Sequence, residues 1–447
     1  MTLLRKSRLV FLIVQELGHK YTKELALGFI SGLILSIGFF RLFPLIKQQW
    51  FIPVDRIGMV GDFTPATLPL TVQQYVSHGL TTVTADGTIK PGLATSWTAT
   101  DSGKTFIFTL RRDAVWHSGK KITASDINYN IRNVTFSPID QFTLRANLKA
   151  PYSAFPAVVA KPLFLNALVG LGEYRVSNIQ LKGNSIVYLK LVPVKSSSSR
   201  EREYRFYKTE AEAILAYKLG EVNEIDDVSS PRDLSDWGKS TLTTQTNYTR
   251  ILSVYFNVTN PKLSDKSVRQ ALAYAISYRS DLERAYSPIS KLSWAYSDKT
   301  KKYTFDMAAA KKLFGNAREG SDSAHLTIST FAPYLSDAQS IAASWTTLGT
   351  KTDVRVENSI PPDYEVLLSA QDVPPDPDQY PLWHSTQKGT NITNYANVKI
   401  DKLLEDGRQE MDMEKRKTIY ADFQRYLTED VPAAFLYYAK SYTVRRH

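Results

Sequence analysis

The side chains able to carry out chemistry are dispersed along this chain of 447 residues. Ser118 and Lys121 match the bare Ser-x-x-Lys spacing that sets a nucleophile beside its base, but the companion motifs of penicillin-type sites do not occur. Neither a Gly-x-Ser-x-Gly nucleophile elbow nor a Gly-x-x-x-x-Gly-Lys phosphate loop is present in the sequence. We therefore predict that the protein is not an enzyme.

Metal binding is not indicated either. No two histidines stand at metal-ligand spacing, and no His-Glu-x-x-His motif occurs. The sequence also has no cysteine, which excludes disulfides and thiolate ligands. We expect neither a metal ion nor a cofactor. The six histidines are His19, His78, His117, His325, His384 and His447.

Composition is that of a globular chain long enough for two or three compact units, with 43% apolar residues to form a core. The net charge of +11 is uneven: the first fifty residues hold seven Lys or Arg and two Glu, which leaves +6 for the other 397. No block of basic residues with interleaved aromatic residues stands out, so we expect no nucleic-acid partner.

One segment near the amino terminus, Leu25 to Ile46, is apolar enough to predict a membrane-spanning helix. The basic residues before it place the amino terminus in the cytoplasm by the positive-inside rule. The rest of the chain then lies outside a cell membrane that it crosses once. The alternative is a cleaved signal peptide, although no small-x-small cleavage site follows the apolar run, where Lys47 to Pro53 stands instead.

Hydrophobic periodicity predicts an α/β protein. Phe106, Phe108 and Leu110 alternate with Thr105, Ile107 and Thr109, the period of two of a strand with one face on a core. The segment 209–220 has helical periodicity and ends in a capping glycine, and its apolar stripe includes Leu215 and Leu219. Strand, helix and strand follow one another within about thirty residues from Leu326 to Val356, a βαβ pattern that argues for a parallel sheet.

Two other helices are predicted from their caps. Thr123 and Asp126 have the spacing of a capping box and precede a short predicted helix over 127–133. Asp265 caps a helix whose apolar stripe runs from Val268 to Ile276 and packs on the sheet. Arg269 is expected on the polar face of that helix.

The segment from Pro91 to Asp126 carries a family resemblance. The order of the residues along this segment resembles that in the family 5 extracytoplasmic solute-binding proteins of peptide and nickel ABC importers. The segments Tyr255 to Ser277 and Asn394 to Lys440 resemble the same family. The matching residues of the first segment are Pro91, Gly92, Leu93, Ala94, Trp97, Gly103, Lys104, Phe106, Phe108, Leu110, Arg111, Gly119, Thr123, Ala124 and Asp126.

The resemblance implies a two-lobed periplasmic-binding-protein type II fold with a reduced third subdomain, preceded here by the transmembrane helix. We expect four parts. They are residues 1–50 as cytoplasmic segment and anchor, 51–79 with 163–250 and 433–447 as lobe 1, 80–162 as the accessory subdomain, and 251–432 as lobe 2. Since the chain has no cysteine, it also lacks the lipid-bearing cysteine that tethers many receptors of this family.

For the binding site, the resemblance implies the loop from Leu367 to Tyr380. Its peptide-binding members begin this loop with glycine and tryptophan and carry an aspartate that meets the α-ammonium group of the ligand. Asp372 is the matching position, although Leu367 and Leu368 replace the glycine-tryptophan pair. Asp376 and Asp378, beside Pro377, are expected to be turn residues.

The function implied is that of the membrane-anchored substrate-binding component of an ABC importer. It binds a short peptide, or a similar small solute, between its lobes by hinge closure and delivers it to permease subunits. We expect a monomer. The alternative is a membrane-tethered sensor or surface scaffold on the same fold that takes no part in transport, which the missing glycine-tryptophan pair and the permanent anchor favour.

Overall fold

The structure is a computed structural model that describes residues 21–23, 27–38, 53–195, 200–229, 234, 237, 240–318 and 325–446. The chain divides into two compact units, Met1–Asp55 and Arg56–His447. In the first unit, residues 27–38 form a helix whose side chains are almost all exposed. The expected span from Leu25 to Ile46 reaches beyond the described ranges.

Within the described ranges, every helix is too short or too polar to cross a bilayer.

In the part of the chain that the structure describes, the main sheet has ten strands. Strands β13, β14 and β15 run parallel to one another, as the strand-helix-strand pattern predicted. In spatial order the strands are β14 (Lys351–Val356), β13 (His325–Thr330), β15 (Val366–Asp372), β12 (Ser240–Phe256), β16 (Ala433–Arg446), β11 (Glu224–Val228), β1 (Val54–Val60), β10 (Glu201–Tyr207), β9 (Ser185–Pro193) and β8 (Tyr174–Lys182).

Strands β12 and β16 join the two halves of this sheet. They pair antiparallel along most of their length, with an irregularity between Asn247 and Ile251. On one side of it β11 pairs with β16, and on the other β15 pairs with β12. We call the half that contains β1 and β8 to β11 the first lobe, and the half that contains β13 to β15 the second lobe. The junction between them consists of these two strands and includes the irregularity in their pairing, and the residue boundaries predicted for the lobes stay predictions.

Helices cover both faces of the second lobe. Strand alternation divides its core, because Val366 and Leu368 belong to one apolar cluster and Leu367 belongs to the other. The first cluster lies under α6 (Lys266–Tyr274), α7 (Met307–Arg318) and α8 (Leu335–Leu348), and the second under α9 (Tyr380–Trp383), α10 (Val398–Gln409) and α11 (Met413–Asp430).

Helix α6 corrects the prediction for Arg269. Asp265 caps the helix as expected, and its side chain accepts a hydrogen bond from the amide of Ser267. Arg269, however, is buried and donates to the carbonyls of Asp430 and Val431 at the end of α11. The last carbonyls of a helix have no partner within that helix, so a buried guanidinium that satisfies two of them is stabilising. Arg269 is therefore a core residue and not a polar-face charge.

The first lobe carries α3 (Leu70–Val76) and α5 (Glu210–Leu219). Helix α5 begins at the capping residue Thr209 and ends at Gly220, whose φ of 81° is left-handed, as predicted. Its predicted apolar face is wrong, because Leu215 and Leu219 are exposed while Ala213, Ala216 and Tyr217 are buried. Small alanine side chains let the helix approach the strands closely, so the face with the alanines is the buried one.

A separate sheet of four strands, β4 (Ala94–Thr100), β5 (Thr105–Leu110), β7 (Thr143–Leu148) and β6 (Val134–Pro138), has α4 (Phe155–Val158) and the hairpin of β2 (Thr81–Val83) and β3 (Ile89–Pro91) beside it. Phe106 and Phe108 are fully buried on β5, which confirms the predicted alternation.

The helix predicted after β5 is wrong. The Thr123 and Asp126 capping box forms, but it closes a single 3₁₀ turn, Ala124–Asp126. Beyond the turn Asn130 and Asn133 have φ values of 50° and 65°, outside the helical region. Tyr129 donates to the carbonyl of Val159, and this tertiary contact replaces helical hydrogen bonding.

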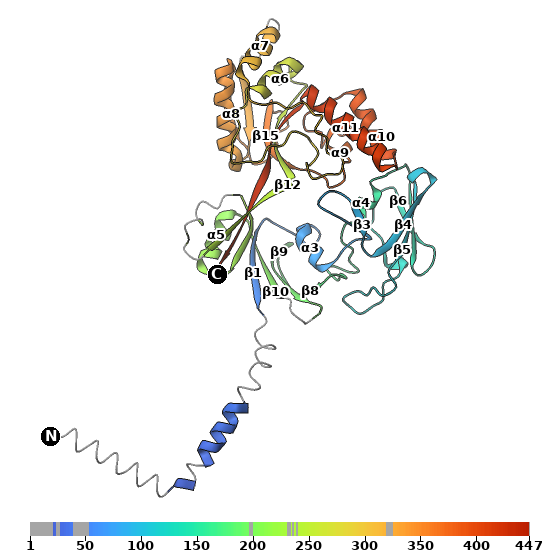
Figure 1. Cartoon of the computed structure of the whole chain (residues 1–447), viewed down its shortest axis with the longest axis vertical. Helices are drawn as coiled ribbons and strands as arrows, with labels where there is room; N and C mark the ends of the chain where they lie inside the picture. The colour runs from blue at the N-terminus through green and yellow to red at the C-terminus, as the bar shows by residue number, and fades with distance from the viewer. Residues whose placement is uncertain are drawn as a thin grey trace, which may run out of the picture. The chain divides into compact units, whose positions relative to one another are not determined.

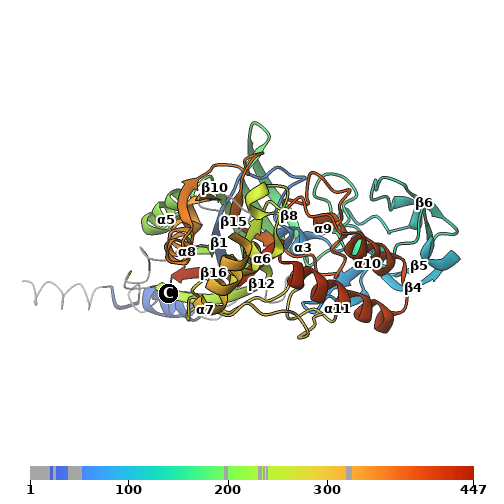
Figure 2. The ribbon, with the colours of Figure 1, turned by 90° about the horizontal axis from the view of Figure 1, so that it is seen from above.

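The segment between β7 of the four-stranded sheet and α4 bonds to the second lobe. Tyr152 Oη donates to Asp378 Oδ2 at 3.0 Å, and the amide of Ser153 donates to the carbonyl of Arg408 at 2.7 Å. Figures 1 and 2 both place this sheet beside α10. The accessory region thus bonds to the lobe opposite the one that it follows in the chain.

Candidate functional site at the lobe junction

Asp372 lies at the end of β15, beside the strands that join the lobes. By strand alternation its side chain is on the same face as Val366 and Leu368, the face covered by α8. Its Oδ1 accepts a hydrogen bond from Arg250 Nε at 2.7 Å, and the side chain is 70% exposed. The predicted ligand contact is therefore already paired with a guanidinium from the neighbouring strand.

Arg250 also reaches the first lobe. Its Nη1 lies 3.8 Å from Oδ2 of Asp227 in β11, so one guanidinium contacts carboxylates of both lobes. Burial raises the pKa of Asp227; Arg250 opposes this shift, and Asp226 and Asp372 reinforce it. We call Asp227, Arg250 and Asp372 the hinge triad. Two carboxylates against one guanidinium leave it with a formal net charge of −1.

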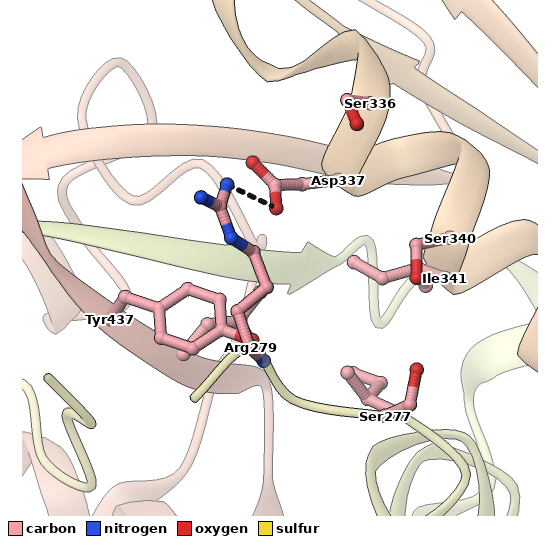
Figure 3. Close-up of a pocket in the computed structure, with 9 residues that line it drawn as sticks. Ser277, Arg279, Ser336, Asp337, Ser340, Ile341 and Tyr437 are labelled. Carbon is pink, nitrogen blue, oxygen red and sulfur yellow. Dashed lines mark hydrogen bonds and ion pairs between the residues drawn. The ribbon is translucent and has the colours of Figure 1, made fainter. Parts of the chain in front are cut away.

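A pocket of about 300 Å³ opens on the α8 face of the second lobe (Figure 3). Its apolar wall comes from α8, from the segment that follows α6 and from β16. Its polar groups are hydroxyls and one oppositely charged pair. The lining residues are Ile276, Ser277, Arg279, Ser336, Asp337, Ser340, Ile341, Leu436 and Tyr437.

Arg279 and Asp337 form the charged pair of this pocket. Arg279 Nη1 lies 3.5 Å from Asp337 Oδ1, while Nε and Nη2 of the same guanidinium bind Asp281 at 3.0 and 2.7 Å. Burial raises the pKa of Asp337; Arg279 opposes the shift and Asp281 reinforces it. The Asp337 side chain is only 14% exposed, and its ion pair with Arg279 is long.

Tyr334 lies directly before α8, the helix that carries Asp337. It ends the short 3₁₀ turn Ala332–Tyr334. Burial raises the pKa of Tyr334; Arg250 opposes the shift, and Asp372 and Asp337 reinforce it. The side chain of Asp372 and the pocket both lie on the α8 face of the second lobe, and we treat triad and pocket as one candidate binding region.

Asp376 and Asp378 lie deeper in the second lobe. Their side chains accept hydrogen bonds from the amides of Asp378 and Tyr380, so the prediction that they are turn residues is confirmed. Both are also buried and paired, Asp376 with Arg416 and Asp378 with Arg408, at 2.9 Å in each case. The sequence reading missed these ion pairs, whose partners lie in the last two helices.

Ser118 and Lys121 stand on an exposed turn of the accessory region, where a short β-bridge pairs Val115 with Lys121. Sequence reasoning missed Arg250, Arg279 and Asp337. Asp337 is in the first turn of a helix, where an acidic residue is explained by the helix dipole alone. Arg250 meets Asp372 only through the register of β12 and β15, which residue types do not reveal.

Two lobes joined by paired strands, with a charged pocket beside the junction, define a solute-binding protein of the periplasmic type. The model of the bacterial extracellular solute-binding proteins, family 5 (middle region), matches residues 88–145 and 133–391, and the chain belongs to this family. Members of the family are binding proteins, which confirms the prediction that the chain is not an enzyme.

Relatives with assigned ligands are distant. The oligopeptide-binding protein AppA of Bacillus subtilis is 27% identical over 229 residues, which cover 42% of this chain and 41% of AppA. Di/tripeptide-binding protein 1 of Pseudomonas aeruginosa is 22% identical over 80% of this chain and 82% of the length of that protein.

Solved structures share the fold. The ABC transporter substrate-binding protein CtaP of Listeria monocytogenes superposes with a TM-score of 0.74 at 24% identity, over 88% of this chain and 94% of CtaP. NikZ of Campylobacter jejuni, solved with Ni(L-His), gives a TM-score of 0.73 at 22% identity over the same shares.

Proposed function

We propose that the chain is the extracytoplasmic substrate-binding component of an ABC importer, and that it carries a short peptide or a similar small solute. The observation that supports this most is the hinge triad, in which Arg250 contacts carboxylates of both lobes across the joining strands. A solute that contacts the triad interacts with both lobes at once. Its binding energy therefore favours the closed arrangement, in which a permease is engaged.

The proposal includes parts that remain predictions: Asp372 as a ligand contact, a retained membrane anchor within Leu25 to Ile46, an extracytoplasmic location and a monomeric state. The anchor and the location are tested together by protease treatment of intact cells, in which an external tag at the carboxyl end is removed and an amino-terminal tag is protected. Protection of both tags would contradict the orientation.

The binding function predicts that solute raises the melting temperature of the full-length chain. A ligand that binds only the folded state adds about 2.7 kcal/mol of stability at a concentration one hundred times its Kd. The probes are di- and tripeptides of alanine and leucine, a nickel-histidine chelate and a maltooligosaccharide. A rise with one class identifies the solute class. If none of the three classes raises the melting temperature, the transport proposal is wrong.

A sensor or scaffold on the same fold is the second candidate. The Arg250 and Asp372 ion pair favours it, because a side chain already takes the place expected for the ammonium group of a ligand. Uptake separates the two: cells that lack the chain fail to accumulate the solute if it serves transport, and accumulate it normally if it is a sensor.

A further inference from the structure

Arg284 lies in the segment that follows α6, where the chain runs beside β16. A β-bridge joins Arg284 to Tyr437, and the amide of Ala285 donates to the carbonyl of Leu436. Because β12 pairs with the opposite edge of β16 at these residues, Arg284 lies on the edge that β11 covers in the first lobe. The backbone of the sheet therefore determines where this guanidinium lies.

The guanidinium of Arg284 has fewer partners than donors. Its Nη2 donates to the carbonyl of Tyr303 at 3.3 Å, whereas Nε and Nη1 are buried and meet no acceptor among the described residues. Within those residues no carboxylate forms an ion pair with it either, and the groups that favour its charged form are tyrosines. Because a guanidinium has five N–H donors and no acceptor, most of its hydrogen-bonding capacity is left unused in a buried place.

Three tyrosine rings stand around this charge. The guanidinium carbon lies 3.0 Å from the ring centroid of Tyr278, 5.0 Å from that of Tyr286 and 5.7 Å from that of Tyr437. Ring faces attract a cation, but the attraction offsets only part of the cost of removing a guanidinium from water. Burial accordingly lowers the pKa of Arg284, and the tyrosines oppose the shift. A buried positive charge without a carboxylate partner favours an anion from solution.

A small cavity lined by Arg284 sets the size of that anion. Its volume is about 10 Å³, enough for one particle of the size of a water molecule. Lys301 lines the same cavity, and the ammonium nitrogen of Lys302 lies 5.4 Å from the ring centroid of Tyr286. Glu429 pairs with Lys301 at 3.3 Å, so Arg284 and Lys302 keep the surroundings positive. The cavity is too small for a phosphate or a peptide carboxylate, whereas a monatomic anion fits it.

We infer that this cavity is a halide site, in which chloride is the counter-ion of Arg284. The residues that line it come from the segment after α6, from the end of α11 and from β16. The bound anion holds that segment against β16 and so stabilises the second lobe. The inference goes beyond the proposed function and does not depend on it, because no residue of the hinge triad or of the larger pocket lines the cavity.

The first test is the melting temperature of the full-length chain in sodium chloride and in sodium gluconate at equal ionic strength. An anion that binds only the folded state raises stability, so we expect chloride to raise the melting temperature by about 1–3 °C relative to gluconate. Arg284→Met keeps most of the side-chain volume without the charge and should remove this difference. Arg355→Met is the matched control and should retain it, because Arg355 is 56% exposed and already paired with Glu357.

A second measurement does not depend on the folding of any variant. Crystals of the unmodified chain grown with bromide in place of chloride reveal bound halide by anomalous scattering. We expect a bromide peak within hydrogen-bond distance of a guanidinium nitrogen of Arg284. Peaks confined to exposed lysine and arginine side chains would mean an adventitious ion only, and a water molecule at Arg284 in place of bromide would mean that this cation is hydrated. Either outcome overturns the inference, as does a chloride effect on the melting temperature that persists in Arg284→Met.

Discussion

Replacement of Arg416 by methionine is expected to lower the free energy of unfolding by about 3–5 kcal/mol, the cost of leaving a buried charge without its partner. Arg416 and Asp376 are each less than a tenth exposed, and they pair at 2.9 Å. Methionine keeps most of the side-chain volume but supplies no donor, so Asp376 is left in the core as an unpaired carboxylate. Chemical denaturation of the full-length chain measures the loss.

The control lies on the same helix. Arg425 pairs with Asp422 at 2.9 Å with both side chains about half exposed, and Arg425→Met should cost less than about 1 kcal/mol. Equal effects of the two substitutions would contradict the burial argument.

The pH dependence of the Arg416→Met variant has a definite sign. Burial raises the pKa of Asp376 in the folded protein, and Arg416 opposes this shift. Without Arg416 the folded-state pKa rises further above its unfolded value. A group with a raised folded-state pKa stabilises the fold while it is protonated, and this contribution is lost as the pH rises through that pKa. The loss of unfolding free energy in Arg416→Met should therefore be largest at neutral pH and become smaller as the pH is lowered.

Substitution of Gly87 by alanine is expected to weaken solute binding more than tenfold by holding the accessory hairpin away from the second lobe. Gly87 has a φ of 82°, and a Cβ atom there would lie 2.3 Å from the carbonyl oxygen of Pro375. Asp86, the residue before Gly87, accepts a hydrogen bond at its carbonyl from the amide of Trp294. A Cβ atom cannot lie 2.3 Å from a carbonyl oxygen. One of the two backbones must therefore move, and the hairpin separates from Pro375.

Gly119→Ala separates this effect from backbone strain. Gly119 has a φ of 83°, nearly the same as Gly87, but nothing lies within 4 Å of its would-be Cβ. Both variants bear the left-handed cost of about 1–2 kcal/mol, and only Gly87→Ala should increase the radius of gyration measured by small-angle X-ray scattering. If the two variants scatter and bind alike, the hairpin contact has no part in closure.

Local patterns were predictable from the sequence where neighbouring residues decide the structure. The burial of Phe106 and Phe108 and the capping glycine that ends α5, Gly220, depend on alternation and on one left-handed residue. Leu215 shows the limit of the same reasoning. Periodicity predicted the helix correctly, but the buried face was predicted from hydrophobicity alone, and the structure buries the face with Ala213 and Ala216 instead.

Long-range partners were not predictable. Arg269 was expected in solvent because it is charged, yet the carbonyls of Asp430 and Val431, far along the chain, require its donors. For the binding region, the family resemblance pointed to Asp372. Its pairing with Arg250 and the weak pairing of Asp337 depend on strand register and on depth in a pocket, which residue types do not encode.

The central position of β16 has a consequence for synthesis of the protein. β16 is the last strand of the sheet in chain order, yet it pairs with both β11 and β12, between the two lobes. Neither lobe can complete its sheet while the ribosome is still translating the residues before Ala433, and such distant pairings form slowly. We expect the nascent chain to stay incompletely folded until late in translation.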